Sequence, residues 1–443
     1  MNAVTWAFTI VKFLLVFVPL VMIPFMIVME RKGASLIQDR FGPNRSALPF
    51  FGGLRLFGMI QNGADGIKLF TKELIVPKFV HKWYYIAAPM IPFAVAIMTP
   101  ALLPWFAPIT FEQGGVLSRI SGQVLDADAG LLVVFALSGL SVYGTVLGGW
   151  SSNSKYALLG GLRSSAMMIS YEVSMGLSVM GLFLLVGSFR LSDIVAWQSH
   201  HVWGILVQPL SFVLYLVSLI AETGRAPFDV AEGEPEIVGH HLEYSAMRFG
   251  LFYMGEYVHI VLNSLLVATM FLGGYDLPIL HTAGIQAHLG IVAAVILAVF
   301  GLSAFGLAVL MRRWIANYQK TDASDKADRR KEYNFMSAGL VVAGVFCFLL
   351  ALLAAVFVHP EATSVGGELV YPLWASAGTA AVQFGVLFVK ALIFCWVWVW
   401  VRWSLPRFRY DQVMSLGWKI FLNLALANLL VTAVIAKIVH GGN

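Results

Sequence analysis

Charged side chains are scarce in this chain of 443 residues. Asp, Glu, Lys and Arg make up 12% of it and hydrophobic residues 59%, whereas a soluble domain averages about 25% charged residues. Many segments reach the ~20 apolar residues needed to cross a ~30 Å hydrocarbon core, so the composition excludes a soluble globular protein. The net charge of +5 does not indicate nucleic-acid binding, because the basic residues gather in loops between apolar segments.

Cysteine is nearly absent. Cys347 and Cys395 lie far apart inside apolar runs. Without a Cys-x-x-Cys or a His/Cys cluster, the chain is not expected to hold an iron–sulfur centre or another metal. The adjacent His240 and His241 have no obvious third ligand, and the Gly-rich string ALLGGLR (157–163) follows no strand, so it is not expected to bind phosphate. Any redox centre is therefore expected in other chains.

The apolar runs predict an all-α polytopic membrane protein with about ten transmembrane helices. They are continuous, unlike the ~10-residue alternating segments of a transmembrane barrel. The first run lacks a cleavage site and is too long for a signal-peptide core, so we expect it to be retained. The predicted spans are roughly 5–29, 84–106, 130–149, 164–187, 203–221, 247–272, 286–311, 336–358, 376–403 and 417–440.

The basic residues are distributed unevenly among the nine loops between these spans. The odd-numbered loops carry 24 of the 29 Lys and Arg residues, and the even-numbered loops hold two, Arg119 and Arg190. By the positive-inside rule the odd loops are cytoplasmic and both termini lie on the other side. The loop at 222–246 then faces the cytoplasm.

Two of these loops have a pattern of their own. In the first, an amphipathic helix is predicted at about 54–73, lying at the membrane interface; a solvated connector is the alternative. Its apolar face would hold Leu56, Ile60 and Ile67, and its polar face Gln61, Asp65, Lys68 and Lys72. The seventh loop, at 312–334, is polar with mixed charge and is interpreted as a flexible surface loop.

Carboxylates gather at one place in the chain. The stretch AETGRAPFDVAEGEPEIVGHHLEYS (221–245) contains Glu222, Asp229, Glu232, Glu234, Glu236 and Glu243. Pro227 favours an extended conformation before it, and the Gly and Pro residues between the glutamates argue against a regular helix. A solvated acidic surface is the simplest interpretation of such a loop.

Further ionisable residues lie inside predicted spans, among them Glu172, Glu256 and Lys390. Each costs about 2.5–3.5 kcal/mol at the bilayer centre, so each is a candidate functional residue. Together with Glu222, the two glutamates have the composition of a proton relay along a hydrated internal route, because burial and repulsion favour proton exchange near neutral pH. A buried structural pair is the alternative for Glu172 and Glu256, and Lys390 lies too deep to be explained by snorkelling.

Several collinear strings are similar to one family. They are ERKGASLIQDRFGPNR (30–45), ADGIKLFTKE (64–73), GWSSNSKYALLGGLRSSAMMISYEVSMGLS (149–178), AETGRAPFDVAEGEPE (221–236), LEYSAMRFGLFYMGEYVHI (242–260) and VRWSLPRFRYDQVMSLGWKIFL (401–422). These strings resemble the membrane subunit of respiratory complex I (NADH:quinone oxidoreductase) that joins the membrane arm to the peripheral arm.

The resemblance implies a multisubunit NADH:quinone oxidoreductase in which this chain has no redox centre of its own. Quinone, the substrate, would enter from the membrane lipid beside the first span and the amphipathic helix, and would travel toward an iron–sulfur cluster of a neighbouring subunit. NADH, FMN and the iron–sulfur clusters are expected in partner subunits. The expected partners are other complex I membrane subunits and the peripheral-arm quinone-site and iron–sulfur subunits. The implied location is the bacterial inner membrane, with periplasmic termini.

At matching motif positions the resemblance implies two sets of residues. The quinone channel would be bordered by Arg31, Asp39, Arg40, Arg45, Asp65, Lys68 and Arg225. The proton or charge relay would comprise Glu172, Glu222, Asp229, Glu232, Glu234, Glu236, Glu243 and Glu256. The FRYDQ string, with Arg407, Arg409 and Asp411, would pack at the cytoplasmic junction.

Three parts are expected along the chain. Residues 1–280 match the family core, 281–372 contain an apparent insertion with an extra pair of spans, and 373–443 hold a C-terminal pair joined by the FRYDQ loop. Family members have about eight spans, so the extra pair suggests a lateral addition for a lineage-specific partner.

Two other functions remain open from the residues. The first is the homologous membrane subunit of an energy-converting hydrogenase, which shares the fold without using quinone; the DRFGPNR and ETGRAPFD strings favour the quinone branch. The second is a stand-alone secondary transporter, which inverted repeats would support; none is detected.

Overall fold

The computed structural model describes residues 3–38, 40, 42–43, 46, 58–113, 116–230, 238–277, 280–318, 327–361, 363–365 and 368–440. Within them, nine helices are long and apolar enough to cross a membrane, and Pro209–Glu222 forms a shorter apolar helix. Helices dominate because a chain in hydrocarbon must satisfy its backbone polar groups internally. The prediction of an all-α polytopic membrane protein is confirmed.

The first half of the chain forms the elements α1 (Ala3–Leu15), α2 (Val18–Ile37), α3 (Met59–Thr71), α4 (Lys82–Ala87), α5 (Met90–Met98), the 3₁₀ helix η3 (Thr99–Leu102), β1 (Ile109–Gln113), β2 (Val116–Ile120), α6 (Gly130–Ser151), α7 (Lys155–Val186), α8 (Leu191–His200), α9 (Gly204–Val207) and α10 (Pro209–Glu222). The second half forms α11 (Ala246–Phe271), α12 (Thr282–Ala287), α13 (Leu289–Tyr318), α14 (Ala327–Phe357), β3 (Thr363–Val365), β4 (Glu368–Val370), α15 (Leu373–Ser404), α16 (Tyr410–Ser415), the π-helical turn η5 (Leu416–Phe421) and α17 (Leu422–His440).

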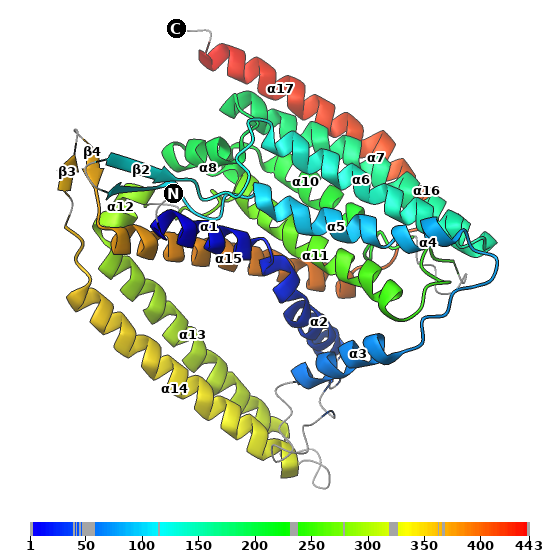
Figure 1. Cartoon of the computed structure of the whole chain (residues 1–443), viewed down its shortest axis with the longest axis horizontal. Coiled ribbons are helices and arrows are strands. Elements are labelled where there is room, and N and C mark those ends of the chain that lie inside the picture. Colours follow the sequence, from blue (N-terminus) through cyan, green and yellow to red (C-terminus); the bar gives the residue numbers. More distant parts are fainter. Residues whose placement is uncertain are drawn as a thin grey trace.

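Helix α11 is the centre of the fold. Every residue from Ile260 to Phe271 is buried, and α2, α5 and α15 pack against this helix. Helices α6, α7, α10 and α17 lie on one side of it, and the α13–α14 hairpin lies on the other (Figure 1). Polar side chains that α11 carries are therefore held deep in the protein.

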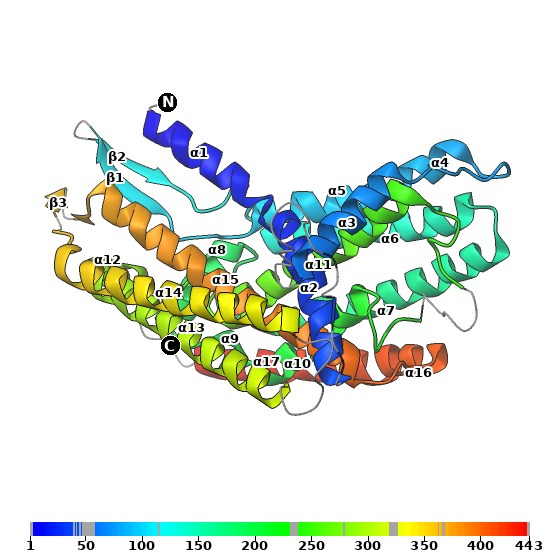
Figure 2. The ribbon, with the colours of Figure 1, turned by 90° about the horizontal axis from the view of Figure 1, so that it is seen from below.

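Both chain ends lie at the same end of the helix bundle, where the two β-hairpins also lie (Figure 1). The first hairpin pairs Ile109 with Ile120 and the second pairs Thr363 with Val370, both antiparallel. The hydropathy pattern did not predict these short strands. Helix α1 projects away from the main body (Figure 2).

Proline determines two of the helix boundaries. The predicted span 5–29 is divided into α1 and α2, because Pro19 has no N–H to donate to the preceding turn. The predicted span 203–221 is divided into α9 and the 14-residue α10, which begins at Pro209. At 1.5 Å per residue, α10 extends about 21 Å, less than the thickness of a bilayer core.

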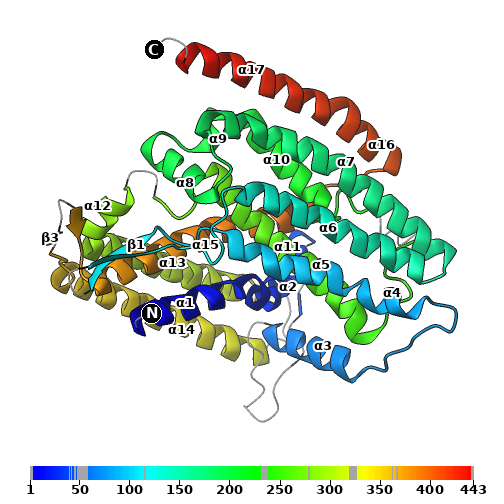
Figure 3. The ribbon, with the colours of Figure 1, turned by 45° about the horizontal axis from the view of Figure 1, so that its top comes forward.

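The helix predicted for 54–73 is present as α3 at Met59–Thr71. Ile67 and Phe70 are exposed on it, as the apolar face of an interfacial helix would be. The α3 helix lies beside α2 (Figure 3). Residues 54–57 lie outside the described part of the chain.

The segment 281–372, which is expected to be an insertion, contains two long helices, α13 and α14, that pack mainly against each other. Both extend further than the predicted spans 286–311 and 336–358. The prediction of a flexible loop at 312–334 is wrong for most of that range, because 312–318 and 327–334 are helical. Their charged residues continue the helices past the apolar runs. Residues 319–326 lie outside the described part.

Candidate functional site

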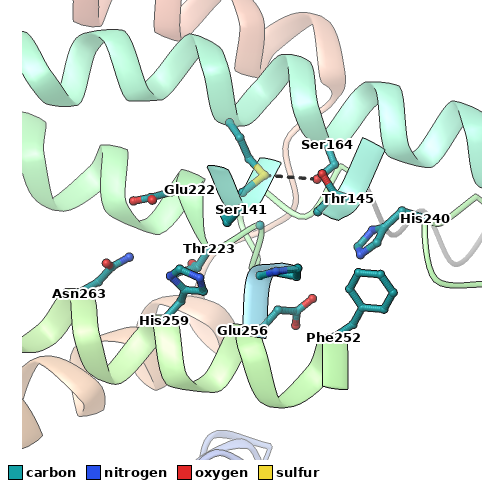
Figure 4. A pocket seen from close by; sticks show the side chains of 13 residues that line it. Ser141, Thr145, Ser164, Glu222, Thr223, His240, Phe252, Glu256, His259 and Asn263 are labelled. Carbon is teal, nitrogen blue, oxygen red and sulfur yellow. Dashed lines mark hydrogen bonds between the residues drawn. The ribbon is translucent and has the colours of Figure 1, made fainter. Parts of the chain in front are cut away.

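Glu222 is the last residue of α10, and its side chain is buried. Gly224, at φ +62°, turns the chain away directly afterwards, a conformation that favours glycine. The hydroxyl of Ser138 in α6 donates a hydrogen bond to the Glu222 carboxylate. Asn263 of α11 lies opposite (Figure 4). The end of a short helix thus positions a carboxylate among three other helices.

Glu172 of α7 packs closely against α6. A Cβ at Gly139 would lie 2.8 Å from Glu172 Oε1, closer than real Cβ contacts. Glycine at this position therefore makes room for the carboxylate. Because Glu172 and Glu222 both border the α6 stretch 138–139, their charges interact electrostatically.

Arg225 forms an ion pair with Glu256 of α11. Its Nη2 lies 2.7 Å from Glu256 Oε2, and the guanidinium is almost fully buried. The same guanidinium lies over the rings of Tyr253 and Tyr257, 5.2 and 4.8 Å from their centroids. Such cation–π contacts gain strength away from water, so the loop after α10 is fixed to α11 by charge and aromatic contact together.

A second polar contact joins α2, α11 and α15. Tyr257 donates a 2.6 Å hydrogen bond to Glu30 Oε2, and Arg402 forms an ion pair with the other oxygen of Glu30. Because Tyr257 also contacts Arg225, the Glu30 and Glu256 carboxylates belong to one network. Charged hydrogen bonds of this kind are the strong ones in proteins.

A cavity of about 60 Å³ lies between α6, α7, α10 and α11. It is lined by Pro92, Ser141, Thr145, Ser164, Met168, Glu222, Thr223, Gly224, His240, Phe252, Glu256, His259 and Asn263. A smaller cavity of about 10 Å³ shares Glu222, His259 and Asn263 with it. Since one water needs roughly 10–15 Å³ of such space, the larger cavity accommodates several waters.

Beside α11, α3 is fixed to α2 by polar contacts. Arg31 Nη2 lies 2.7 Å from Asp65 Oδ2, and Lys68 Nζ lies 3.6 Å from Asp65 Oδ1. Asn62 donates a 2.6 Å hydrogen bond to the Pro24 carbonyl. Partial burial acts to raise the pKa of Asp65, but the hydrogen bond and charge of Arg31, with Lys68, lower it below its ordinary value.

The structure brings together several of the predicted site residues. Glu222 and Glu256 line one cavity, Arg225 is bonded to Glu256, and Glu172 is adjacent. The predicted channel residues Arg31, Asp65 and Lys68 form one cluster, and the exposed Arg40 bonds to Gln38. These predicted site residues therefore form two groups, one among the helices around the cavity and one at the contact between α2 and α3.

The FRYDQ loop contacts the acidic loop. Arg407 Nη2 lies 3.1 Å from Asp229 Oδ2, and the Phe408 N–H bonds to the Pro227 carbonyl. Arg409 pairs with Asp411 at the start of α16. Asp229 is thus drawn toward this loop, away from the cavity.

Glu243 does not line the cavity. Its backbone carbonyl accepts a hydrogen bond from Tyr85, which packs with Tyr244 and Phe252. The predicted site residues Asp39, Arg45, Glu232, Glu234 and Glu236 lie outside the described residues.

Several polar residues of the site were missed in the sequence. Glu30, Tyr257, His259 and Asn263 all lie within strings that carry the family resemblance or directly after them. His259 meets the same criterion that selected Glu256, an ionisable side chain inside a predicted span. Arg402 lies at the end of the predicted span 376–403 and within a string that carries the resemblance, but at the end of an apolar run it resembles an ordinary cytoplasmic charge. Among the described residues, no three His, Cys, Asp or Glu side chains are grouped to hold a metal ion.

Lys390 caps the end of α11. Its Nζ donates hydrogen bonds of 2.7, 2.8 and 2.6 Å to the backbone carbonyls of Leu272, Gly274 and Asp276. Gly273 and Gly274 have φ of +71° and +54°. The turn that they form directs the three carbonyls toward Lys390 Nζ. A cation at a helix C-terminus is also favoured by the helix dipole. The intramembrane lysine thus has a structural role.

Comparison with known proteins identifies the family. The NADH dehydrogenase family model matches residues 9–322 and 331–433. Two relatives, from Geobacter metallireducens and Cytophaga hutchinsonii, are named as the same subunit of NADH-quinone oxidoreductase. They are 37% identical over 420 residues (95% of this chain, 93% of the relative) and 33% identical over 404 residues (91% and 89%). The corresponding protein of Leptospira biflexa is 35% identical over 412 residues, 91% of this chain and 88% of the relative. The chain belongs to the NADH dehydrogenase family that contains these NADH-quinone oxidoreductase subunits.

Proposed function

We propose that this protein is the membrane-arm subunit that forms the quinone channel of a proton-pumping NADH:quinone oxidoreductase and couples quinone reduction to proton translocation. The observation that carries the proposal is the cavity bordered by Glu222 and Glu256. Through Arg225 and Tyr257, Glu256 is joined to Glu30 on α2. A polar network therefore extends from the helix beside the channel to carboxylates among the helices.

Quinone access is assigned to the region of α1, α2 and α3. The α3 helix exposes Ile67 and Phe70 while its polar face binds α2 through Asp65 and Asn62. An amphipathic helix fixed in this way would lie at the membrane surface and border an opening for an apolar substrate. Arg31 and Lys68 would position the polar quinone head, and Arg40, Asp39 and Arg45 would continue the channel.

Electrostatic interactions would couple quinone reduction to proton translocation. Reduction of quinone adds negative charge that must be neutralised by protons, and the Glu30–Arg402 and Arg225–Glu256 pairs would respond to it electrostatically. A shift in the Arg225–Glu256 pair changes the protonation of Glu256, and water in the cavity would carry protons between Glu256 and Glu222. Glu172 lies within electrostatic range of Glu222 and would receive the charge next, whereas Asp229, Glu232, Glu234, Glu236 and Glu243 would form the loop side of the relay.

The partners follow from this role. The peripheral-arm subunits would cover the 222–246 loop and the FRYDQ loop, which meet at Asp229 and Arg407, and would bring NADH, FMN and iron–sulfur clusters. The other membrane subunits would receive the charge beyond Glu172. We place both termini on the periplasmic side of a bacterial inner membrane, because the basic loops favour the cytoplasm. The α13–α14 hairpin is proposed to bind a further partner at its lateral surface.

Membrane vesicles that contain the whole complex allow a direct test. Glu222→Gln and Glu256→Gln should reduce NADH:quinone turnover and proton pumping at least fivefold, because amide side chains do not carry protons. NADH–ferricyanide activity, which reports the attached peripheral arm, should remain. Glu361→Gln, at an exposed carboxylate outside the helices, is the matched control. Normal pumping in both cavity variants would exclude the relay.

A further inference from the structure

His259 lies directly on the route between the two cavity glutamates. It follows Glu256 by three residues and precedes Asn263 by four on α11, a spacing that places all three on one helix face. In Figure 4, His259 lies between Glu256 and Asn263 along the helix, and Glu222 faces Asn263 from α10. His259 lines both the larger and the smaller cavity.

The two ring nitrogens of His259 have different environments. The ring hydrogen-bonds to the backbone of Pro92, while Nε2 is buried with no hydrogen-bond partner in the described part of the chain. Since Nε2 is the unpartnered atom, the bond to the Pro92 carbonyl is assigned to Nδ1–H. In the neutral ring this tautomer leaves the lone pair on Nε2.

The charged groups around His259 come from several elements. Glu256 lies on the same helix, Glu222 comes from α10, and His240 comes from the 238–240 segment. Arg225 is paired with Glu256. The residues that α5 and α6 contribute to the larger cavity, Pro92, Ser141 and Thr145, are uncharged. A basic nitrogen is thus placed between two carboxylates, in a space large enough for water.

We propose that His259 is the proton-accepting group that links Glu256 to Glu222, an inference that rests on the proposed function. A protonated Glu256 gives its proton through water to Nε2, which forms the imidazolium while Nδ1–H stays bonded to Pro92. The same Nε2–H then passes its proton to the Glu222 carboxylate, through water or beside Asn263. Each step moves one proton and no electrons, and the neutral ring is restored without a flip.

The alternative is a purely structural histidine that fills space and bonds to Pro92. The structural role and the proton-accepting role predict different effects of a substitution by glutamine. His259→Gln keeps an N–H donor for the Pro92 carbonyl and a side chain of similar length, but an amide does not accept a proton near neutral pH. His259→Phe keeps the ring shape and removes both nitrogens. His201→Gln is the matched control, because this exposed histidine bonds to the Trp197 carbonyl at the end of α8 and lines neither cavity.

The experiment measures NADH:quinone turnover and proton pumping of the whole complex in membrane vesicles, normalised to NADH–ferricyanide activity. We expect both His259 variants to fall at least tenfold and His201→Gln to match the wild type. Should the Phe variant fail to assemble, the Gln variant alone decides. Turnover within threefold of wild type for His259→Gln overturns the assignment.

Glu222→Gln in the same series separates this inference from the function it rests on. If Glu222→Gln is impaired and His259→Gln is normal, the glutamate relay stands and the histidine link is wrong. If both are normal, the relay itself is wrong.

Discussion

Lys390→Met offers the clearest test of what an intramembrane charge does in this protein. The ammonium donates three hydrogen bonds to carbonyls at the end of α11 and lies 5.0 Å from the centroid of the Trp203 ring. Met fills similar volume but leaves the three carbonyls without their donor. The structural role predicts lost stability.

The expected loss of stability can be calculated from the three hydrogen bonds that Lys390 donates. At about 0.6 kcal/mol each, the average measured inside membranes, their loss costs about 2 kcal/mol. At about 1.5 kcal/mol each, the lower value for bonds to charged groups, it costs about 4.5 kcal/mol, part of which is offset because a buried ammonium is removed. We expect a net loss of about 2–4 kcal/mol in the free energy of unfolding.

The assay is the thermal inactivation of the complex in membranes, together with the amount assembled. Lys390→Met should inactivate several degrees below the wild type and assemble less. Lys437→Met, which removes an exposed lysine from α17, should do neither. A Lys390→Met complex that is as stable as the wild type but does not pump would refute the capping role and place Lys390 in the proton route.

Three further changes have predictable outcomes. Arg402→Met leaves Glu30 without its cation, and breaking such a partly buried pair should lower stability by about 3–5 kcal/mol, seen as loss of assembled complex; Arg119→Met, at an exposed arginine of β2, is the control. Burial raises the pKa of Asp276 to about 6, so its contribution to stability is fully present below about pH 4 and is lost as the pH rises through 6. Asp276→Asn should remove this dependence, worth up to about 3 kcal/mol, in thermal inactivation between pH 4 and 7; equal pH dependence in both proteins would contradict it. Gly160→Ala should cost about 1–3 kcal/mol and slow quinone turnover, because its Cβ would lie 2.6 Å from the backbone carbon of Gly239; an unchanged melting temperature would refute this.

Hydropathy predicted the helices well where nothing interrupts an apolar run. The long helices α6, α11 and α15 lie at their predicted places, because a continuous apolar segment has no other stable form in a membrane. Hydropathy failed at Pro19 and Pro209. Each proline lacks an N–H and so divides the helix, although the mean hydropathy of the whole run is that of an apolar segment. It also failed for the two β-hairpins, whose strands have five residues or fewer.

The sequence predicted the site residues whose type is unusual at their position. It did not predict the residues whose role depends on a contact with a distant part of the chain. Glu222 and Glu256 are conspicuous because a carboxylate in an apolar span is rare, and their meeting at one cavity required the fold. The Glu30–Arg402 pair joins residues 372 positions apart, a contact that no local pattern encodes. Conversely, Glu243 belongs to the same acidic stretch as Glu222, yet it does not line the cavity, and its backbone carbonyl bonds to Tyr85.

The short length of α10 has an electrical consequence. At about 21 Å, it ends at Glu222 before a ~30 Å core is crossed, and the water-sized cavity begins at that end. Where water and ionised groups penetrate, the membrane voltage falls across the remaining thickness. On the proposed topology, a charge that reaches Glu222 from the cytoplasm has crossed little of the field, whereas each charge that continues to the periplasm works against about 2.3 kcal/mol per 100 mV. On that topology, most of the voltage drop lies on the periplasmic side of Glu222.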